Sequence, residues 1–321
     1  MRFLFGCAFL VQCALMLAVL CACVASQQTA GTDRPIIGVL TQPTSGGSLA
    51  PYGNTYIAAS YIKYVEASGA RAVPIFHNST KAQLQDMFNS VNGLLFPGGD
   101  ADTNGTPLFE SAKYLFDLAI AANKDGVHFP IAGHCMGFEI LSMIVSQNLS
   151  VLTPSNAQNI SWPLHFAPDA RSSRLFGDCP EDIYHLYETE PVTLNNHVWA
   201  VTPKTFEQQM ASQCRVISTN YDKDGSEFIS TWEMKNFPIW AIQWHSEKPL
   251  FEWKADEDIN HSEDAVRCMQ FIDTKLGLEA RKNTHQFKSQ TAEQNALIYN
   301  WCPIYSSKLT GDDFNQAYVW E

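Results

Sequence analysis

The sequence has little positive charge, and after residue 25 it has no apolar run long enough to cross a membrane. Lys and Arg number 21 against 33 Asp and Glu, which gives a formal net charge of −12. This balance excludes a basic protein that binds nucleic acid through its overall charge. The chain also lacks internal repeats, low-complexity tracts and a Pro-rich linker. We therefore expect one folded domain rather than an array of modules.

HExxH and paired CxxC motifs, which are common signs of a zinc site, are absent as well. A zinc site built from His245, Glu247 and cysteines is therefore a weak alternative. Only 17% of the residues are charged and 45% are hydrophobic, which excludes a disordered chain. A chain of 321 residues with this composition can bury a large core, so its nine cysteines need not hold the fold together.

Residues 1–25 are typical of a signal peptide. Arg2 is followed by a stretch without charge that ends in small residues, and we expect cleavage near Ser26. Because the stretch is about long enough to span a bilayer, an uncleaved membrane anchor is the alternative. Cleavage removes a single charge, that of Arg2, and changes the net charge from −12 to −13. It leaves residues 26–321 as one mature domain without stable membrane association.

The mature part keeps an odd number of cysteines: Cys135, Cys179, Cys214, Cys268 and Cys302. An odd number in a secreted chain leaves at least one free thiol, which we expect to be Cys135. The other four either form two disulfides or stay free. Motifs for N-glycosylation occur at Asn78, Asn104, Asn148, Asn159 and Asn260. Their number agrees with the secretory pathway, and with a destination in the extracellular space, a lysosome or a vacuole.

The first half of the mature chain alternates between apolar strands and amphipathic helices. We expect strands at residues 35–40, 72–76, 93–96 and 127–132, and helices at residues 56–67, 81–88, 107–124 and 136–145. Pro74 favours an edge position for the second strand. Beyond residue 148 we expect shorter β segments at 215–218, 227–234 and 239–243, a helix near 265–276, and an aromatic tail that packs on the body. This order predicts an α/β fold: a doubly wound, mostly parallel sheet flanked by helices, with additional β elements in the C-terminal half.

The strongest chemical signal is Gly133-His134-Cys135-Met136-Gly137, which lies between an expected strand and an expected helix. A GxCxG motif in this place holds its middle residue on a sharp bend, because small neighbours avoid clashes there. The positive end of the following helix favours a thiolate. We therefore expect Cys135 to be a nucleophile rather than a buried structural thiol or half of a disulfide.

A base for this thiol is expected in Trp244-His245-Ser246-Glu247, at the end of the apolar run 239–243. In extended backbone, residues i and i+2 face the same side, so Glu247 can accept from one nitrogen of His245 while the other nitrogen faces the thiol. The third motif is Pro97-Gly98-Gly99, directly after a strand. The N–H groups of Gly98 or Gly99 and of Met136 are candidates for an oxyanion hole.

In the order PGG, GxCxG, WHxE, the sequence resembles the class I glutamine-amidotransferase-like superfamily and, within it, the γ-glutamyl hydrolases, which act on folate polyglutamates. The resemblance covers nearly all of the mature chain. Matching stretches outside the triad are residues 35–43, 92–99, 137–139, 228–231, 243–245, 280–283, 296–299 and 303–305.

The resemblance implies Cys135 as nucleophile, His245 as general base and proton donor, and Glu247 as the acid that orients His245. It also places His197 where the family has a further histidine near the site. Two positions depart from the family pattern: Ser246 stands where many relatives have proline, and His134 where a small polar residue is common.

The implied reaction is hydrolysis of a γ-glutamyl bond through a thioester, which needs no metal and no organic cofactor. The expected partner is a folyl poly-γ-glutamate, and a second copy of the chain is a further candidate. Because the chain is acidic, the anionic substrate must meet local cations, for which Arg174 and Lys248 are candidates. Glu139 is a candidate for binding an α-amino group, and His197 is a further candidate for contact with the substrate.

Three other functions are alternatives. A glutaminase subunit of a synthetase is disfavoured by secretion and by the lack of a synthetase domain. An α/β-hydrolase with a cysteine elbow is disfavoured because its acid normally precedes its histidine in the chain. A binding protein for γ-glutamyl peptides that has lost turnover is the non-enzymatic alternative, and it would tolerate replacement of Cys135.

Overall fold

A computed structural model describes residues 31–309 and 314–321. The predicted signal peptide, residues 1–25, lies outside the described residues. Residues Thr32–Glu321 form one compact unit. Within the described part, no helix combines the length and the apolar character that crossing a bilayer requires.

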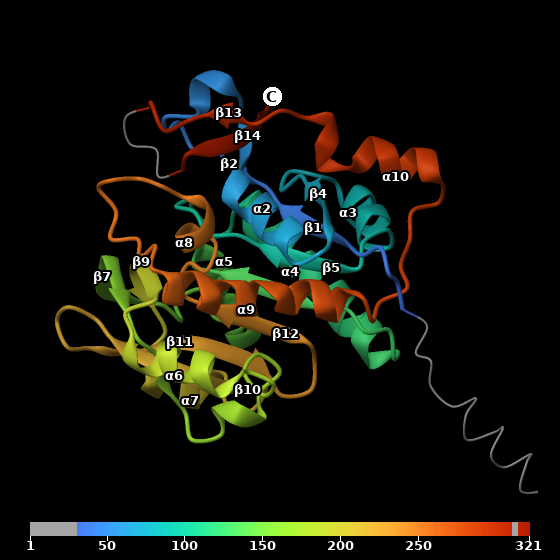
Figure 1. The fold of residues 1–321 in the computed structure, drawn as a ribbon. Coiled ribbons are helices and arrows are strands. Elements are labelled where there is room, and N and C mark those ends of the chain that lie inside the picture. The colour runs from blue at the N-terminus through green and yellow to red at the C-terminus, as the bar shows by residue number, and fades with distance from the viewer. Residues whose placement is uncertain (1–30, 310–313) are drawn as a thin grey trace, which may run out of the picture. The chain divides into compact units, whose positions relative to one another are not determined.

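The centre of this unit is an eight-stranded sheet (Figure 1). Its strands, in spatial order, are β4 (Arg71–Ile75), β1 (Ile36–Leu40), β5 (Gly93–Phe96), β6 (Ile131–His134), β12 (Ile239–Ile242), β11 (Glu227–Met234), β10 (Cys214–Tyr221) and β8 (His165–Phe166). The strands from β4 to β12 are parallel to one another, and the pairs from β12 to β8 are antiparallel. The predicted mostly parallel sheet is confirmed, and β4, which contains Pro74, lies at its edge as expected.

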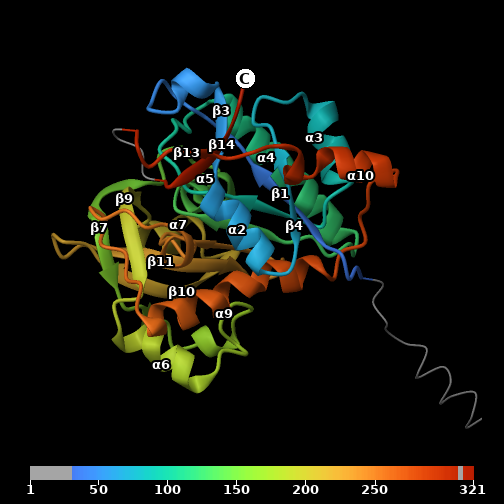
Figure 2. The same ribbon diagram turned by 45° about the horizontal axis from the view of Figure 1, so that its top comes forward.

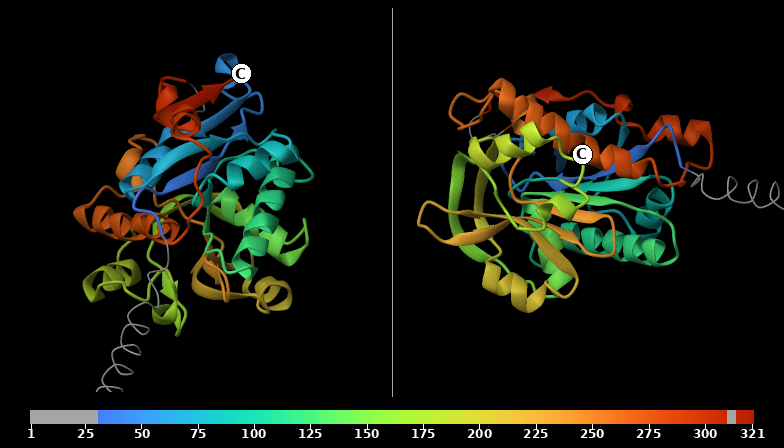
Figure 3. Two further views of the ribbon diagram at one scale, coloured as in Figure 1. Left: turned by 90° about the vertical axis from the view of Figure 1, so that its right-hand side faces the viewer. Right: turned by 60° about the horizontal axis from the view of Figure 1, so that its bottom comes forward.

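Helices cover both faces of this sheet (Figure 3). They are α2 (Ala59–Ala67), α3 (Lys81–Phe88), α4 (Pro107–Lys124), α5 (Met136–Ser146), α6 (Glu181–Thr189), α7 (Pro203–Gln209), α8 (Lys248–Phe251), α9 (Glu263–Ala280) and α10 (Gln290–Ala296), with short 3₁₀ turns at η1 (Ala50–Tyr52), η2 (Ala170–Ser172) and η3 (Ile298–Asn300). Local signals set several helix starts. Thr80, for example, forms a capping box with Gln83 at the start of α3.

The two faces of β1 show how the core is divided. Ile37 and Val39 belong to the cluster that includes residues of α2 and α9, whereas Ile36 and Leu40 belong to the cluster that includes α3, α4 and α5. Because both faces are buried, the strand is apolar at nearly every position, as expected for a parallel sheet between helix layers. Burial of these two clusters is the main stabilising contribution to the unit.

Two smaller antiparallel sheets lie beside the eight-stranded sheet (Figures 1 and 2). The first contains β13 (Ile304–Tyr305), β14 (Gln316–Trp320), β3 (Thr55–Ala58) and β2 (Gln42–Pro43), and the second contains β7 (Thr153–Trp162) and β9 (Thr193–Ala200). The predicted return of the aromatic tail is confirmed, because β14 pairs with β3 and Trp320 is buried.

Two predicted segments take a different conformation over part of their length. Residues 127–130 form a loop rather than the start of a strand, because the backbone N–H of Phe129 donates to the side chain of Asn123 at the end of α4. Residues 56–58 are extended rather than helical, because they pair with β14. In both cases a partner distant from the local pattern decides the conformation.

The carboxyl ends of β5, β6 and β12 lie side by side, because these strands are parallel neighbours. The three predicted motifs each follow one of these strands. In open α/β sheets, ligands bind at the carboxyl edge of the strands.

Candidate active site

Cys135 sits on a sharp bend between β6 and α5. Its backbone has φ 48° and ψ −108°, a conformation that side chains other than glycine rarely adopt. Its N–H donates to the carbonyl of Ile242 on the neighbouring strand, at 2.9 Å. Gly137 permits the bend, because a Cβ there would lie 1.9 Å from the carbonyl oxygen of Phe96. The bend therefore presents the thiol at the carboxyl edge of the sheet.

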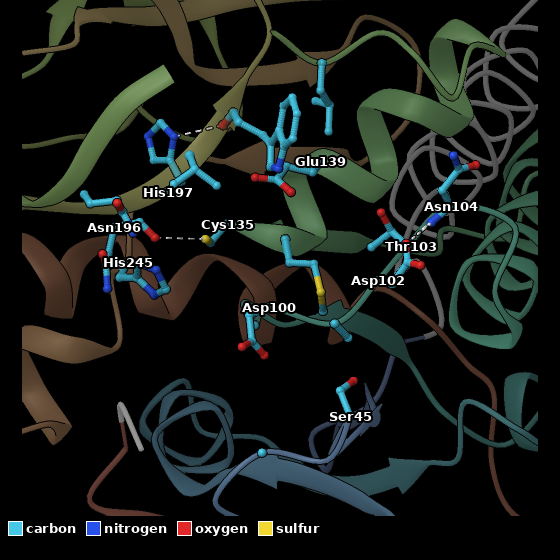
Figure 4. Close-up of a pocket in the computed structure, with 18 of the residues that line it drawn as sticks. Ser45, Asp100, Asp102, Thr103, Asn104, Cys135, Glu139, Asn196, His197 and His245 are labelled. Carbon is cyan, nitrogen blue, oxygen red and sulfur yellow. Dashed lines mark hydrogen bonds between the residues drawn. The ribbon is translucent and has the colours of Figure 1, made fainter. Parts of the chain in front are cut away.

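His245 lies beside this thiol (Figure 4). Its backbone N–H donates to the carbonyl of Leu194 on β9 at 2.8 Å, which fixes the residue after β12 has ended. Its ring and the side chain of Cys135 meet at Gly98, where an added Cβ would lie 3.0 Å from Cε1 of His245 and 3.1 Å from Cβ of Cys135. Its Nδ1 lies 2.7 Å from Oε1 of Glu247. Glu247 is fully buried. Cys135, His245 and Glu247 thus lie next to one another in the predicted order.

Burial and charge act in opposite directions on this pair. Burial alone would lower the pKa of His245, but the nearby Glu247 and Cys135 side chains raise it to about 10. Burial alone would raise the pKa of Glu247, but the charge of His245 and the hydrogen bond from His245 hold it well below its usual range. An imidazolium next to a carboxylate is therefore the stable state near neutral pH.

Two further groups contact the pair. The hydroxyl oxygen of Tyr61, on α2, lies 3.3 Å from Nδ1 of His245. His134, one of the two departures from the family pattern, is buried with its Nδ1 3.8 Å from Oε2 of Glu247. Sequence reasoning missed Tyr61, because its helical spacing with other apolar residues is also that of an ordinary core residue.

Of the predicted oxyanion residues, Gly98 packs against Cys135, and Gly99 packs against the side chain of Gln42. A Cβ at Gly98 would lie 2.3 Å from the Tyr61 hydroxyl and 3.1 Å from the Cβ of Cys135, so only glycine fits between them. The side chain of Gln42 donates to the carbonyl of Gly98 at 2.8 Å and fixes this turn. Met136 is the first residue of α5, so its N–H has no partner within the helix.

A cavity of about 780 Å³ opens over the sulfur. It is lined by Cys135 and His245, by Glu139 from α5, by His197 from β9 and by Lys248 from α8. Figure 4 shows Asp100, Asp102, Thr103 and Asn104 on one side of this cavity, with Asn196, His197 and His245 on the other. The cavity thus joins the nucleophile to polar groups from several elements.

Burial changes the charge state of two residues in the cavity. It raises the pKa of Glu139 to about 8, although Gln243 and His245 act in the opposite direction. It lowers the pKa of His197 to about 3, against a hydrogen bond to the carbonyl of Trp199. At neutral pH both side chains are therefore uncharged, and Glu139 can donate a hydrogen bond to an anion.

We expect Glu139→Gln to reduce the loss of stability that the protein undergoes as pH rises from about 5 to 8. Between the usual pKa of a glutamate and about 8, the folded protein holds a proton that the unfolded chain releases, so rising pH destabilises the fold. This group contributes on the order of 1 kcal/mol per pH unit, and glutamine removes that contribution. Urea unfolding at several pH values measures the effect.

The control for this experiment is Glu110→Gln, which removes an exposed acid from α4. It should leave the pH dependence of stability as in the wild type. An equal or steeper dependence in Glu139→Gln than in the wild type would contradict the proton assigned to Glu139.

The structure does not bring Arg174 to the cavity. Its guanidinium donates to the carbonyl of Met234 at 3.0 Å and lies 3.9 Å from Glu233, on the side of β11. Lys248 does line the cavity and forms an ion pair of 2.6 Å with Glu257.

The five cysteines of the predicted mature part are all free thiols, so of the two possibilities for Cys179, Cys214, Cys268 and Cys302 the structure shows the unpaired one. Four of them are buried, and Cys302 is exposed. In residues 31–309 and 314–321, no cluster of three or more His, Cys, Asp and Glu side chains is arranged to hold a metal ion.

Comparisons with known proteins identify the family of this chain. The model of the peptidase C26 family matches residues 35–247. γ-Glutamyl hydrolase B of Dictyostelium discoideum is 38% identical over 87% of this chain and 81% of its own, and the human γ-glutamyl hydrolase is 38% identical over 90% of both chains. Among solved structures, the glutaminase domain of Trypanosoma brucei CTPS covers 80% of this chain and 98% of its own, with 14% identity and a TM-score of 0.48. The chain belongs to the peptidase C26 family, together with these γ-glutamyl hydrolases.

Proposed function

We propose that this protein is a cysteine-type γ-glutamyl hydrolase that cleaves the γ-glutamyl bonds of folate (pteroyl) poly-γ-glutamates. The observation that carries the proposal is that Cys135 and His245 line one cavity at the carboxyl edge of the sheet, with Glu247 at 2.7 Å behind the imidazole. Identities of 38% to enzymes with this activity, over most of the chain, support the choice of bond.

In the first half of the proposed reaction, the sulfur of Cys135 attacks the γ-carbonyl carbon of a glutamyl residue. The carbonyl oxygen becomes negative, and N–H groups of Gly98 or Gly99 and of Met136 stabilise it. The C–N bond then breaks while His245 gives its proton to the leaving amine. A thioester on Cys135 and a free amine are the products of this half.

In the second half, His245 takes a proton from a water molecule that attacks the thioester. The C–S bond breaks, the acid leaves, and the sulfur returns as a thiolate beside a protonated His245. Glu247 keeps the imidazole in one orientation and stabilises its positive form throughout. Both halves use only side chains that line the cavity or contact those that do.

The substrate carries several carboxylates, and two uncharged groups face it. Glu139 in its protonated form can donate to a carboxylate of the substrate, whereas neutral His197 donates its one N–H to the carbonyl of Trp199 and offers the substrate an acceptor at Nε2. Lys248 also lines the cavity, and its ammonium group is paired there with Glu257 at 2.6 Å.

The proposal includes a route through the secretory pathway. Residues 1–25 act as a signal peptide in it, and residues 26–321 are the mature domain. Asn78, Asn104 and Asn159 are exposed in the fold, so glycan can be added there without unfolding. The mature enzyme then works outside the cell or in a lysosome or vacuole.

Incubation of the purified chain with pteroyl-pentaglutamate tests the proposed function. We expect shortened pteroyl products and released glutamate or glutamyl peptides at some pH between about 4 and 8, the range in which imidazole groups titrate or act as acids and bases. The absence of any product across this range, from a folded protein, would overturn the assignment.

A further inference from the structure

Two polar atoms behind the catalytic pair face each other without a hydrogen bond. They are Oε2 of Glu247 and Nδ1 of His134, which are 3.8 Å apart. Both atoms are buried, and neither has a hydrogen-bond partner in residues 31–309 and 314–321. A separation of 3.8 Å is too long for a hydrogen bond between them. Because buried polar atoms without a partner lower the stability of a fold, this arrangement needs an explanation.

The two carboxylate oxygens of Glu247 have different neighbours. Oε1 accepts the Nδ1–H of His245 at 2.7 Å, whereas Oε2 faces His134. His134 is the last residue of β6, where it is in register with Ile242 of β12, and it directly precedes Cys135. The carboxylate of Glu247 therefore lies between the catalytic imidazole and a second one.

Two tyrosines of α2 hold the ring of His134 in place. The ring centroid of His134 lies 4.8 Å from that of Tyr64 at an interplanar angle of 80°, and 6.0 Å from that of Tyr61 at 65°. Both are edge-to-face contacts, which are a favoured packing of rings. All three side chains are buried. This packing keeps the second imidazole next to Glu247.

Phenols and acids make up most of the other titratable side chains around Glu247. They are Tyr61 and Tyr64 from α2, Asp273 from α9 and Glu252 after α8. Burial raises the pKa of Asp273 well above its usual range, so this side chain is uncharged at neutral pH. Lys248, the next residue in the chain, is paired with Glu257 at 2.6 Å. Burial lowers the pKa of His134, so its ring is neutral and carries one N–H.

The charge beside Glu247 changes during the proposed reaction. The positive charge of His245 stabilises the carboxylate at the start. His245 becomes neutral when it gives its proton to the leaving amine, and it stays neutral until it takes a proton from the attacking water. During this interval the buried carboxylate depends on hydrogen bonds, because a buried charge without them is costly. Oε2 still lacks one, and Nδ1 of His134 is next to it.

We propose that His134 is a positioning residue that donates its Nδ1–H to Oε2 of Glu247 while His245 is neutral. A movement of Nδ1 from 3.8 Å to about 2.9 Å completes this hydrogen bond. Glu247 then keeps His245 in the tautomer whose Nε2 accepts a proton from the attacking water. His134 thus acts through Glu247 and serves mainly the hydrolysis of the thioester. The inference rests on the proposed function and adds a second histidine to it.

Two substitutions separate the hydrogen bond from the packing of the ring. His134→Phe keeps an aromatic ring beside Tyr64 but has no donor. His134→Asn has no ring but keeps an amide N–H close to the position of Nδ1. The substrate is pteroyl-diglutamate, which has a single γ-glutamyl bond between glutamyl residues. Steady-state kinetics give kcat and KM as a function of pH, and circular dichroism checks the fold of each variant.

We expect His134→Phe to lower kcat about tenfold, as the loss of one hydrogen bond to a charged group does. KM should fall with kcat, because slower hydrolysis lets the thioester accumulate, and kcat/KM should change little. The acid limb of kcat should move to higher pH, because a carboxylate without this donor keeps the proton on His245 up to a higher pH. His134→Asn should have a higher kcat than His134→Phe and an acid limb nearer that of the wild type.

His128→Phe is the matched control. The side chain of His128 is also next to a glutamate, with its Nε2 2.7 Å from Oε2 of Glu279, but it does not line the cavity. This variant should keep wild-type kinetics at every pH.

Wild-type kcat and pH profile in a folded His134→Phe would overturn the role of His134. An equal or larger loss of kcat in His134→Asn would overturn it as well, because the ring and not the donor would then matter. If His134→Phe does not fold, His134→Gln takes its place, since its amide reaches the position of Nε2 rather than Nδ1. A kcat of His134→Gln equal to that of His134→Asn would contradict the proposal. An inactive wild type would instead refute the proposed function.

Discussion

Replacement of Cys135 by alanine should lower kcat on a γ-glutamyl substrate by about 10⁴-fold or more. No other group in the cavity can form the thioester, so only the residual effect of the oxyanion hole and of binding remains. Binding of the substrate should persist, because the cavity and its polar groups are unchanged. Steady-state kinetics and calorimetric titration measure the two quantities on the same preparation.

The matched control is Cys302→Ala. Cys302 is also a free thiol but is exposed and does not line the cavity. This variant should keep wild-type kinetics and should still lose activity when iodoacetamide alkylates Cys135. Substantial turnover by Cys135→Ala would indicate another nucleophile. If the wild type binds the substrate without turnover and Cys135→Ala binds it equally well, the non-enzymatic alternative is favoured.

Glu247→Gln should lower kcat by about 10³- to 10⁴-fold. The carboxylate accepts the Nδ1–H of His245 at 2.7 Å, and an amide at this position can present its own N–H and favour the wrong tautomer. Loss of the negative charge also removes one cause of the raised pKa of His245. The imidazolium is then lost at lower pH, so the alkaline limb of the residual activity should move to lower pH.

Glu233→Gln serves as the comparison for this variant. Glu233 is also a buried glutamate, but it accepts hydrogen bonds from Arg215 and lies on β11, outside the cavity lining. The folded fraction of this variant should keep its kcat and pH profile, although its stability falls. If Glu233→Gln and Glu247→Gln reduce kcat equally, the effect reports general damage to the fold and not a role for Glu247.

The part of the site that follows strands could be predicted from the sequence. The glycines at Gly98 and Gly137, the thiol and the imidazole each come directly after an apolar run, and parallel neighbours place such positions at one edge. These positions can be predicted from local sequence alone, because a bend with no room for a side chain requires glycine in any fold. The structure accordingly brings these residues together.

Other parts of the site depend on contacts that no local pattern encodes. Tyr61 has the spacing of a core residue, and only the position of α2 in the fold places its hydroxyl near His245. The extended state of residues 55–58 depends on pairing with residues 317–320, more than 250 positions away in the chain. Arg174 was a candidate because of its charge alone, and charge does not determine which side of a sheet a residue occupies.

The backbone conformation of Cys135 lowers the stability of the fold and at the same time presents the reactive thiol. A residue other than glycine in such a conformation costs on the order of 1–3 kcal/mol of folding free energy, a large share of a typical domain's margin. Glycine at this position would relieve the strain and remove the sulfur. Selection of variants for thermal resistance alone would therefore favour a glycine there, and the most durable form of the protein would be inactive.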